Sequence, residues 1–423
     1  MRLFVINIIW LFCSLYIIAL LSALIILYKN CRVYIEVIFK ALFIWCVYFM
    51  KTKRILFIVN VDTFFISHRL PIALAAINAG CEVHLACLTS GEEYTDRLTS
   101  HGIIVHSIPL SRAGISLFQE IKSFLSIYNI IKSVNPDVLH LVTAKPVTYG
   151  GIINKLFFSK KCVVSISGLG YIFIDNKITV KFLRFIIVCA YRFSLNNKNT
   201  HVIFQNNDDR SLFSNLSIVS DGNSSIVRGS GVNLNNYMVM PNPAGIPIVV
   251  LVSRLLYDKG VREFVDAANI LRARKIPVRM VLVGDVDKNP NSVKKNEIES
   301  WVCSRAIEYW GFRSDIGSVM GLASIVALPS YREGLPKCLI EAAACGRAVI
   351  TTDVPGCKDA IINNRTGLLV PVKNHLALAD AIEYLVLNPN VRAKMGVEGR
   401  KLAEEYFDIS LVINEHMRLY NLR

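Results

Sequence analysis

From Arg54 onward, short runs of consecutive apolar residues alternate with longer stretches in which apolar residues recur at helical spacing. Such runs are typical of parallel strands buried on both faces, and the stretches between them are typical of crossover helices. In the first part of the chain the predicted strands are Ile55–Asn60, Glu82–Cys87, Ile103–His106, Val138–Val142, Cys162–Ser167 and Val202–Phe204. The pattern therefore predicts a doubly wound α/β domain, with a connecting helix over Ile115–Val134 among others.

The same alternation returns after Gly229–Ile246, a stretch rich in Gly, Asn and Pro that indicates a linker. Further strands are expected near Val249, Val281, Ile307, Ile325, Val349 and Leu368. The predicted fold class is therefore α/β with two doubly wound domains, the first over residues 51–240 and the second over residues 241–405.

One segment of the second domain combines a strand, a turn and a helix. Ser324–Leu328 is a predicted buried strand, Tyr331–Gly334 a polar turn, and Leu335–Cys345 a helix that ends at Gly346. Pro336 fits the first turn of this helix, where an amide donor would be unpaired in any case. Ligands of open α/β sheets bind beyond the carboxyl ends of the strands, and the first amides of a helix favour phosphate.

Charged side chains near this turn indicate what the ligand is. Glu333 and Glu341 bracket the turn and could accept hydrogen bonds from sugar hydroxyls, although Lys337 and Glu341 could also be an ordinary exposed i, i+4 pair. A second strand-to-helix loop, after the strand at Val249, carries Arg254 and Lys259, which could grip a diphosphate from the opposite side. Phosphate and hydroxyl groups together indicate a nucleotide sugar.

Four motifs, SRLLYDKG, VLVGD, YWGFRSD and PSYREGLPKCLIEAAACG, together resemble the retaining glycosyltransferases of family GT4. The resemblance covers roughly Lys51 to Arg423 and is closest to bacterial enzymes that extend lipid-linked oligosaccharides for O-antigen, capsule or glycoprotein glycans. It implies the GT-B fold: two Rossmann-like domains facing a cleft, with a last helix (residues 406–423) that crosses back onto the first domain. It also implies transfer of a hexose or N-acetylhexosamine from a nucleotide sugar, expected to be UDP-linked, to a polyprenyl-diphosphate-linked saccharide.

The resemblance implies roles for the residues of the second domain. Arg254, Lys259 and the helix amides after Gly334 would stabilise the leaving diphosphate, while Glu333 would orient the donor sugar and Glu341 the ribose. The other expected donor-binding residues are Gly284, Phe312, Gly334 and Leu335. No covalent nucleophile is evident, so the resemblance implies front-face attack, in which the leaving phosphate oxygen takes the acceptor's proton.

No cofactor and no metal are expected, although Asp285 and Asp287 form a DxD pattern. In this fold class the cations Arg254 and Lys259 can replace a metal, and the loop that follows the aspartates has a plain turn composition.

Acceptor-side candidates lie in the strand-to-helix loops of the first domain. The pair His68-Arg69 resembles a signature of this subgroup, although a surface pair at a helix start is about as well supported. Many family members carry a second histidine where this chain has Val142, so Lys145 is the better candidate for touching phosphate. The acceptor-side or cleft candidates are Asn60, His68, Arg69, His140 and Lys145.

Composition raises the question of a membrane. Hydrophobic residues make up 53% of the chain, and the first 49 residues contain no Gly, Pro, Asp, Thr, His or Gln. Leu3–Tyr28 carries no charge and is long enough to span a bilayer, whereas Cys31–Phe49 carries charges and fits the membrane interface. Two alternatives stay open. Residues 1–50 are an anchor that holds the catalytic domains on the cytoplasmic face of a bacterial inner membrane, or the functional chain begins at Met50.

The net charge of +15 also indicates an anionic partner. The first 49 residues account for only +3 of it (four basic residues and one acidic), which leaves +12 on the rest of the chain. No nucleic-acid motif is present, so anionic lipid or a phosphate-rich substrate is the expected partner. Lys177–Arg192 alternates basic and apolar residues, although an ordinary core-facing helix with a basic edge would do the same. The eleven cysteines show no zinc spacing and indicate free thiols in a reducing compartment.

Two other function classes compete with a transferase. One is a membrane-tethered nucleotide-sugar-binding subunit without activity, and the other is a GT-B epimerase, which would need no lipid acceptor. The first is disfavoured because an inactive homologue need not keep Arg254, Lys259, Glu333 and Glu341 together.

Overall fold

The computed structural model describes residues 52–110, 117–169, 173, 178–287 and 289–422. They form two α/β halves, each built around one parallel sheet, as the apolar pattern predicted. Within these ranges no helix is both long enough and apolar enough to cross a bilayer. The predicted spanning segment Leu3–Tyr28, the interfacial segment Cys31–Phe49 and the basic residue Lys177 all lie outside the described residues.

The first half contains a sheet of order β3-β2-β1-β4-β5-β6-β7. Its strands are β1 (Arg54–Val61), β2 (Glu82–Leu88), β3 (Ile103–Ser107), β4 (Val138–Val142), β5 (Lys161–Ile166), β6 (Thr200–Phe204) and β7 (Ser224–Ile226). The short strand β7 was not predicted, because its sequence Ser-Ser-Ile contains no apolar run. Chain order breaks between β1 and β4, so the loops that follow these two strands lie at a topological switch point.

Helices cover both faces of this sheet. They are α3 (Asp62–His68), α4 (Leu70–Asn78), α5 (Glu92–Ser100), α6 (Leu117–Val134), α7 (Ala144–Ile153), α8 (Ile178–Leu195) and α9 (Asn207–Asn215). Alternate residues of β1 serve the two cores: Phe57 packs with α4 on one face, and Leu56 packs with α6 and α7 on the other. This alternation is the period of two that a strand buried on both faces requires.

The second half contains a sheet of order β10-β9-β8-β11-β12-β13. Its strands are β8 (Ile248–Val252), β9 (Arg279–Val283), β10 (Glu308–Tyr309), β11 (Ile325–Leu328), β12 (Ala348–Thr352) and β13 (Gly367–Val370). Its helices are α10 (Val261–Ala273), α11 (Lys295–Cys303), α12 (Ile316–Leu322), α13 (Lys337–Ala344), α14 (His375–Leu387) and α15 (Pro389–Tyr406). Here chain order breaks between β8 and β11, so the loops carrying Lys259 and Glu333 are neighbours at a second switch point.

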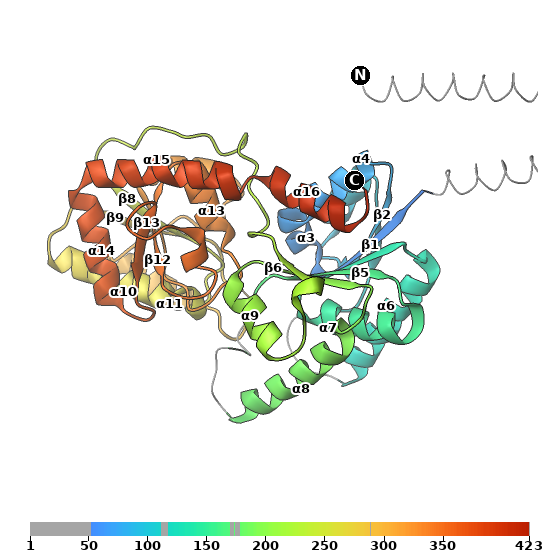
Figure 1. Cartoon of the computed structure of the whole chain (residues 1–423). Helices are drawn as coiled ribbons and strands as arrows, with labels where there is room; N and C mark the ends of the chain where they lie inside the picture. Colours follow the sequence, from blue (N-terminus) through green and yellow to red (C-terminus); the bar gives the residue numbers. More distant parts are fainter. Residues whose placement is uncertain (1–51, 111–116, 170–172, 174–177, 288, 423) are drawn as a thin grey trace, which may run out of the picture. The chain divides into compact units, whose positions relative to one another are not determined.

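The chain returns to the first half after α15. Helix α16 (Ile409–Leu419) packs against α4, and Tyr420 completes the core on that face of the first sheet (Figure 1). The outgoing and returning segments are joined, because the Val232 amide donates to Phe407 O (2.8 Å) and the Ile409 amide donates to Val232 O (3.0 Å).

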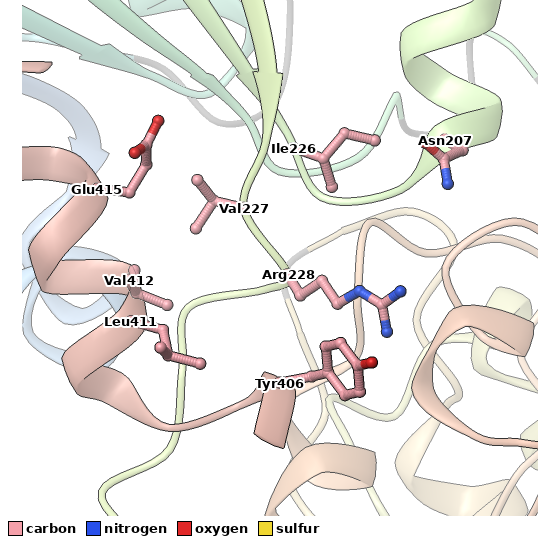
Figure 2. Close-up of a pocket in the computed structure, with 8 residues that line it drawn as sticks. All are labelled: Asn207, Ile226, Val227, Arg228, Tyr406, Leu411, Val412 and Glu415. Carbon is pink, nitrogen blue, oxygen red and sulfur yellow. The ribbon is translucent and has the colours of Figure 1, made fainter. Parts of the chain in front are cut away.

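An open pocket of about 470 Å³ lies beside these two joined segments. Within it, Arg228 stacks on the ring of Tyr406 at 4.5 Å (Figure 2). It is lined by Asn207, Ile226, Val227, Arg228, Tyr406, Leu411, Val412 and Glu415. None of the predicted site residues lines it, so the candidate site has to be sought at the switch points.

Candidate active site

The turn between β11 and α13 departs from its prediction in one respect. Helix α13 begins at Lys337 instead of Leu335, and Pro336 is the residue that caps it, with φ −66° and ψ 122°. A residue that precedes proline is driven out of the helical region, so Leu335 cannot be helical. Gly346 ends the segment with φ +67°, the left-handed conformation expected of a terminating glycine.

Lys259 and Glu333 meet at the second switch point. Lys259 Nζ donates to Glu333 Oε1, and Ser330 Oγ donates to the same oxygen at 2.8 Å. Both charged side chains are largely buried, with 17% and 14% of their surface exposed. Burial on its own would lower the pKa of Lys259, but the Glu333 carboxylate outweighs it and the pKa is raised. Lys259 is therefore a fixed cation beside the turn.

Glycine at position 260 makes this approach possible. Gly260 has φ +74°, and a Cβ added there would lie 2.2 Å from the carbonyl oxygen of Pro329. The loop after β8 can therefore press against the end of β11 only because this residue has no side chain.

Arg254 lies on the same loop but is much more open. Its Nη1 is 3.0 Å from Asp287 Oδ2, and 63% of its side chain is exposed. The second aspartate of the DxD pattern is thus the partner of Arg254, and its other oxygen accepts from the Asn289 amide (2.9 Å) as in an ordinary turn. The first, Asp285, accepts from the amide of Val286 (2.7 Å).

Glu341 on α13 is buried, so the alternative of an exposed i, i+4 pair is wrong. Tyr237 OH donates to its Oε1 (2.6 Å), and Lys337 Nζ lies 3.6 Å from the same oxygen. Burial raises the pKa of Glu341, while Lys337 and Tyr237 act in the opposite direction. Lys337 also donates to the carbonyl oxygen of Ser67 (2.9 Å), which links α13 to the first half.

The other predicted donor-binding residues fall into different environments. Gly284 follows β9 and pairs through its backbone with Gly311, and its carbonyl oxygen accepts from Tyr309 OH (3.0 Å). Phe312 is 73% exposed, whereas Leu335 is buried. The Leu335 amide donates to Gln205 Oε1 (3.0 Å), so a role of this amide toward the leaving phosphate stays a prediction and would require that hydrogen bond to be exchanged.

Gly334 touches the first half directly. Its carbonyl oxygen accepts from Asn206 Nδ2 (2.8 Å), and a Cβ added to Gly334 would lie 2.3 Å from Gln205 Oε1. Sequence reasoning missed both Gln205 and Asn206. Their position immediately after β6, at the carboxyl edge of the first sheet, is the signal that could have identified them.

Asn60 lies within β1, at its penultimate position, and His68 is the last residue of α3, which follows directly, so neither lies in the strand-to-helix loop expected there. The Oδ1 atom of Asn60 is buried and has no hydrogen-bond partner within the described part of the chain. Burial lowers the pKa of His68 to about 3, and the charges of Lys337, Arg69 and Arg254 lower it in the same direction. His68 is therefore a neutral imidazole within the electrostatic reach of two cations of the second half.

Arg69 is buried, with 2% of its surface exposed, so the alternative of a surface pair is wrong. Its Nη2 donates to Ser167 Oγ (3.3 Å) and its Nη1 to the His68 carbonyl oxygen (3.2 Å). Burial lowers the pKa of Arg69 to about 10, which still leaves the guanidinium charged at neutral pH.

The prediction that His140 lines the cleft is wrong, because its side chain lies in the core beneath the first sheet. Nδ1 pairs with Tyr420 OH and Nε2 with Ser165 Oγ (2.8 Å), so both ring nitrogens are engaged. Burial, with the charges of His416 and Arg69, lowers the pKa of His140 well below its usual value.

Lys145 lies in the first turn of α7 and pairs with Glu120. The Nζ to Oε1 distance is 2.5 Å, and the other Glu120 oxygen accepts from Tyr149 OH at 2.6 Å. A phosphate at Lys145 stays a prediction, and it would have to compete with this carboxylate.

Two protein families match the chain. Residues 240–402 match the model described as "Glycosyl transferases group 1", and residues 54–206 match "Glycosyl transferase 4-like". The chain belongs to the GT4 glycosyltransferases. Members of this family are glycosyltransferases, and so is this chain.

Curated relatives act in glycan assembly. The chain is 29% identical over 367 residues to the N,N'-diacetylbacillosaminyl-diphospho-undecaprenol alpha-1,3-N-acetylgalactosaminyltransferase of Campylobacter jejuni, covering 84% of this chain and 94% of the relative. It is 23% identical to the Escherichia coli UDP-Gal:alpha-D-GlcNAc-diphosphoundecaprenol alpha-1,3-galactosyltransferase, covering 70% of this chain and 78% of that enzyme.

A solved structure establishes the GT-B architecture. Anabaena Alr3699/HepE, solved in complex with UDP-glucose, superposes with a TM-score of 0.67 at 18% identity, over 86% of this chain and 98% of that one. At this identity the likeness concerns the fold alone.

Proposed function

We propose that this GT4 enzyme transfers a hexose or N-acetylhexosamine from a UDP-sugar to a polyprenyl-diphosphate-linked saccharide, at the cytoplasmic face of a bacterial inner membrane. The observation that carries the proposal is the largely buried Lys259–Glu333 pair at the switch point between β8 and β11. The Campylobacter and Escherichia coli relatives, both named for undecaprenyl-diphosphate-linked saccharides, support the acceptor class. The UDP-glucose complex of the Anabaena protein supports the donor class.

Lys259 and Arg254 would act on the leaving group. Cleavage of the sugar–phosphate bond places negative charge on the diphosphate, and two cations held beside it stabilise that charge as it forms. Lys259 is fixed by Glu333, whereas the exposed Arg254 can leave Asp287 to meet the diphosphate.

Glu333 and Glu341 are held in the same way, each by two side chains that contact one carboxylate oxygen. Lys259 and Ser330 both contact Oε1 of Glu333, and Tyr237 and Lys337 both contact Oε1 of Glu341. We therefore assign Oε2 of Glu333 to a hydroxyl of the donor sugar and Oε2 of Glu341 to the ribose hydroxyls. With no nucleophile assigned, the leaving phosphate oxygen would accept the acceptor's proton as the new bond forms on the same face of the sugar.

An exposed apolar surface on the first half supports a membrane-bound acceptor. Helices α6 and α8 and the π-helical turn after α7 (Asn154–Phe158) lie over the same face of the first sheet (Figure 1). Their exposed large apolar residues are Phe118, Ile121, Leu125, Leu156, Phe157, Ile178, Phe182, Leu183, Phe185, Ile186 and Phe193. We call this set the α6–α8 surface. The alternative of an ordinary core-facing helix with a basic edge does not account for α8, since Phe182 is 67% exposed while Tyr191 is buried.

Basic residues accompany the α6–α8 surface. Lys122, Lys155 and Lys181 lie on the same three elements, and this half is predicted to hold the acceptor. Apolar side chains flanked by cations suit the interface of an anionic bilayer, where the rings enter the headgroup region and the cations meet lipid phosphates.

The experiment that tests the proposal is a donor and acceptor matrix. Purified protein is incubated with UDP-GalNAc, UDP-GlcNAc, UDP-Gal or UDP-Glc, with and without polyprenyl-diphosphate-linked saccharides, and both UDP release and the mass of the lipid product are measured. We expect one donor to give UDP release that depends on the lipid-linked acceptor. Absence of product with every UDP-sugar would refute the donor class. Equal transfer to free saccharides would refute the lipid-linked acceptor.

A further inference from the structure

We propose that Gln205 and Asn206, which belong to the first half, are positioning residues that hold the donor turn Arg332–Leu335 of the second half. We call these two side chains the Gln205–Asn206 clamp. The inference rests on the proposed function in so far as that turn is the one that meets the donor sugar.

The clamp acts on a single peptide group. The Leu335 amide donates to Gln205 Oε1 (3.0 Å), and the Gly334 carbonyl oxygen accepts from Asn206 Nδ2 (2.8 Å). These two backbone atoms are the donor and the acceptor of the peptide unit that joins Gly334 to Leu335, so the unit is fixed at both edges. Both clamp side chains are buried, which strengthens their hydrogen bonds and makes loss of either one costly.

Asn206 is itself held by the helix it precedes. Its Oδ1 accepts from the Asp209 amide (2.8 Å) and thereby caps α9. The Asp209 carboxylate, also buried, pairs with Arg332 Nη2 across the two halves. Burial raises the pKa of Asp209, and Arg332 opposes that shift. Asp209 at the start of α9 therefore links the capped helix to Arg332 of the second half.

Close contacts with neighbouring backbone restrict the conformation of the turn Arg332–Leu335. A Cβ on Gly334 would lie 2.5 Å from the Ser167 carbonyl oxygen, and a Cβ on Gly356 would lie 2.4 Å from the Glu333 carbonyl oxygen. Glu333 thus stands between Arg332 and Gly334, both of which are tied to the first half. The direction of its carboxylate depends on those ties, and misplacement of a positioned group by a fraction of an ångström is enough to slow catalysis.

Hydrogen exchange tests the clamp without any donor. The Leu335 amide of the wild-type chain should exchange slowly, and Gln205→Leu, which removes the acceptor, should accelerate its exchange roughly tenfold or more. Gln205→Glu keeps an acceptor oxygen and should restore protection. Gln119→Leu, at an exposed position on α6, is the matched control and should change nothing at Leu335. Equal exchange in wild type and Gln205→Leu would overturn the clamp, whatever the enzyme's activity.

Kinetics test the positioning role. Asn206→Ser keeps an oxygen to cap α9 but loses the donor to Gly334, and it also carries the test if Gln205→Leu does not fold. Both variants should lower kcat/KM for the UDP-sugar about tenfold with little change in the KM of the acceptor, and Gln205→Glu should recover most of the loss. Values within twofold of wild type would overturn positioning. A wild-type enzyme that uses none of the donors would refute the proposed function instead, and the exchange result would still decide the clamp.

Discussion

A largely buried ion pair such as Lys259–Glu333 contributes little to the stability of the fold. Removing two charges from water costs several kcal/mol per ion, and an apolar pair of similar volume is often as stable or more so. Here both ions are largely buried, and a serine hydroxyl also fixes the carboxylate. An arrangement of this kind indicates a functional site more than a structural one.

Tyr237 supports the second carboxylate, and its hydroxyl can be removed cleanly. Tyr237→Phe leaves Glu341 with Lys337 as its partner on Oε1, so the carboxylate should be held less firmly for the ribose. We expect the KM for the UDP-sugar to rise about three- to tenfold with kcat nearly unchanged, as when uniform binding is lost. Initial rates over a range of donor concentrations check this. The exposed Tyr384→Phe on α14 is the control, and an unchanged KM in Tyr237→Phe would count against the ribose assignment.

The buried imidazole of His416 makes the free energy of unfolding depend on pH. Burial, with the charge of Arg69, lowers its pKa to about 3 in the folded chain, against 6.5 when unfolded. The folded state therefore binds fewer protons, and stability that is fully present above pH 6.5 is lost as the pH falls toward 3. In that window His416 should contribute a slope of about 1.4 kcal/mol per pH unit. Urea unfolding of wild type and His416→Met should show a shallower slope for the variant.

The exposed His101→Gln is the control for the acid window. It should leave the slope of unfolding free energy against pH as in wild type. An identical slope in wild type and His416→Met would contradict the assignment of a neutral buried imidazole.

At the scale of elements, the strands that were predicted are those whose apolar runs are unambiguous. The positions of β8 and β11 were evident, and with them the loops that carry Lys259 and Glu333. What the pattern could not show depends on local geometry or on distant partners. Pro336 moved the start of α13 to Lys337, and β7 has too few apolar residues to be recognised. Gln205 has no periodic signal because its role is set by a hydrogen bond to Leu335, in a turn of the second half.

The exposed phenylalanine rings of helix α8 are expected to bind the membrane. The double substitution Phe182→Ser with Phe185→Ser removes two exposed rings, each of which would contribute about 1.5–3 kcal/mol if fully buried in the interface. Binding of the full chain to phosphatidylglycerol-containing vesicles should fall at least tenfold in a flotation assay. Transfer to a short-chain, water-soluble acceptor should persist.

The control for α8 replaces two exposed leucines of the second half, Leu376→Ser with Leu387→Ser on α14. That variant should float with the vesicles as wild type does. If both double variants bind alike, the α6–α8 surface is not the membrane-facing one.

At the scale of the whole molecule, the end of the chain is tied to the first half by contacts between residues far apart in the sequence. Tyr420 pairs with His140, and Lys53 Nζ donates to the Tyr420 carbonyl oxygen (2.6 Å). Such pairings have no local signature, which is why His140 was predicted at a cleft and found in the core. The crossing of the last helix followed from family resemblance and not from any pattern in its own residues.

The residues before Met50 are expected to anchor the chain in the membrane without being needed for folding or activity. A chain started at Met50 contains both sheets and every site residue named above, so we expect it to fold and to transfer sugar. With a charge of about +12 it should bind anionic membranes in a salt-sensitive way. The full-length chain should resist high salt and require detergent, because burial of an apolar span is insensitive to screening.

Membrane washes of both forms, each fraction assayed for transfer, check this prediction. An insoluble or inactive Met50 form would mean that the first segment is part of the fold. Release of both forms by salt to the same extent would mean that the segment does not anchor the chain.

If the Lys259–Glu333 pair lies at the reacting centre, Lys259 variants should lose sugar transfer, and their kcat measures this loss. Lys259→Ala should lower kcat on the order of a hundredfold or more, because it removes charge stabilisation from the transition state. Lys259→Gln keeps a hydrogen-bond donor for Glu333 and should fold with wild-type stability yet be similarly impaired, while the exposed Lys295→Ala serves as control. A kcat near that of wild type in a well-folded Lys259→Gln enzyme would contradict the account.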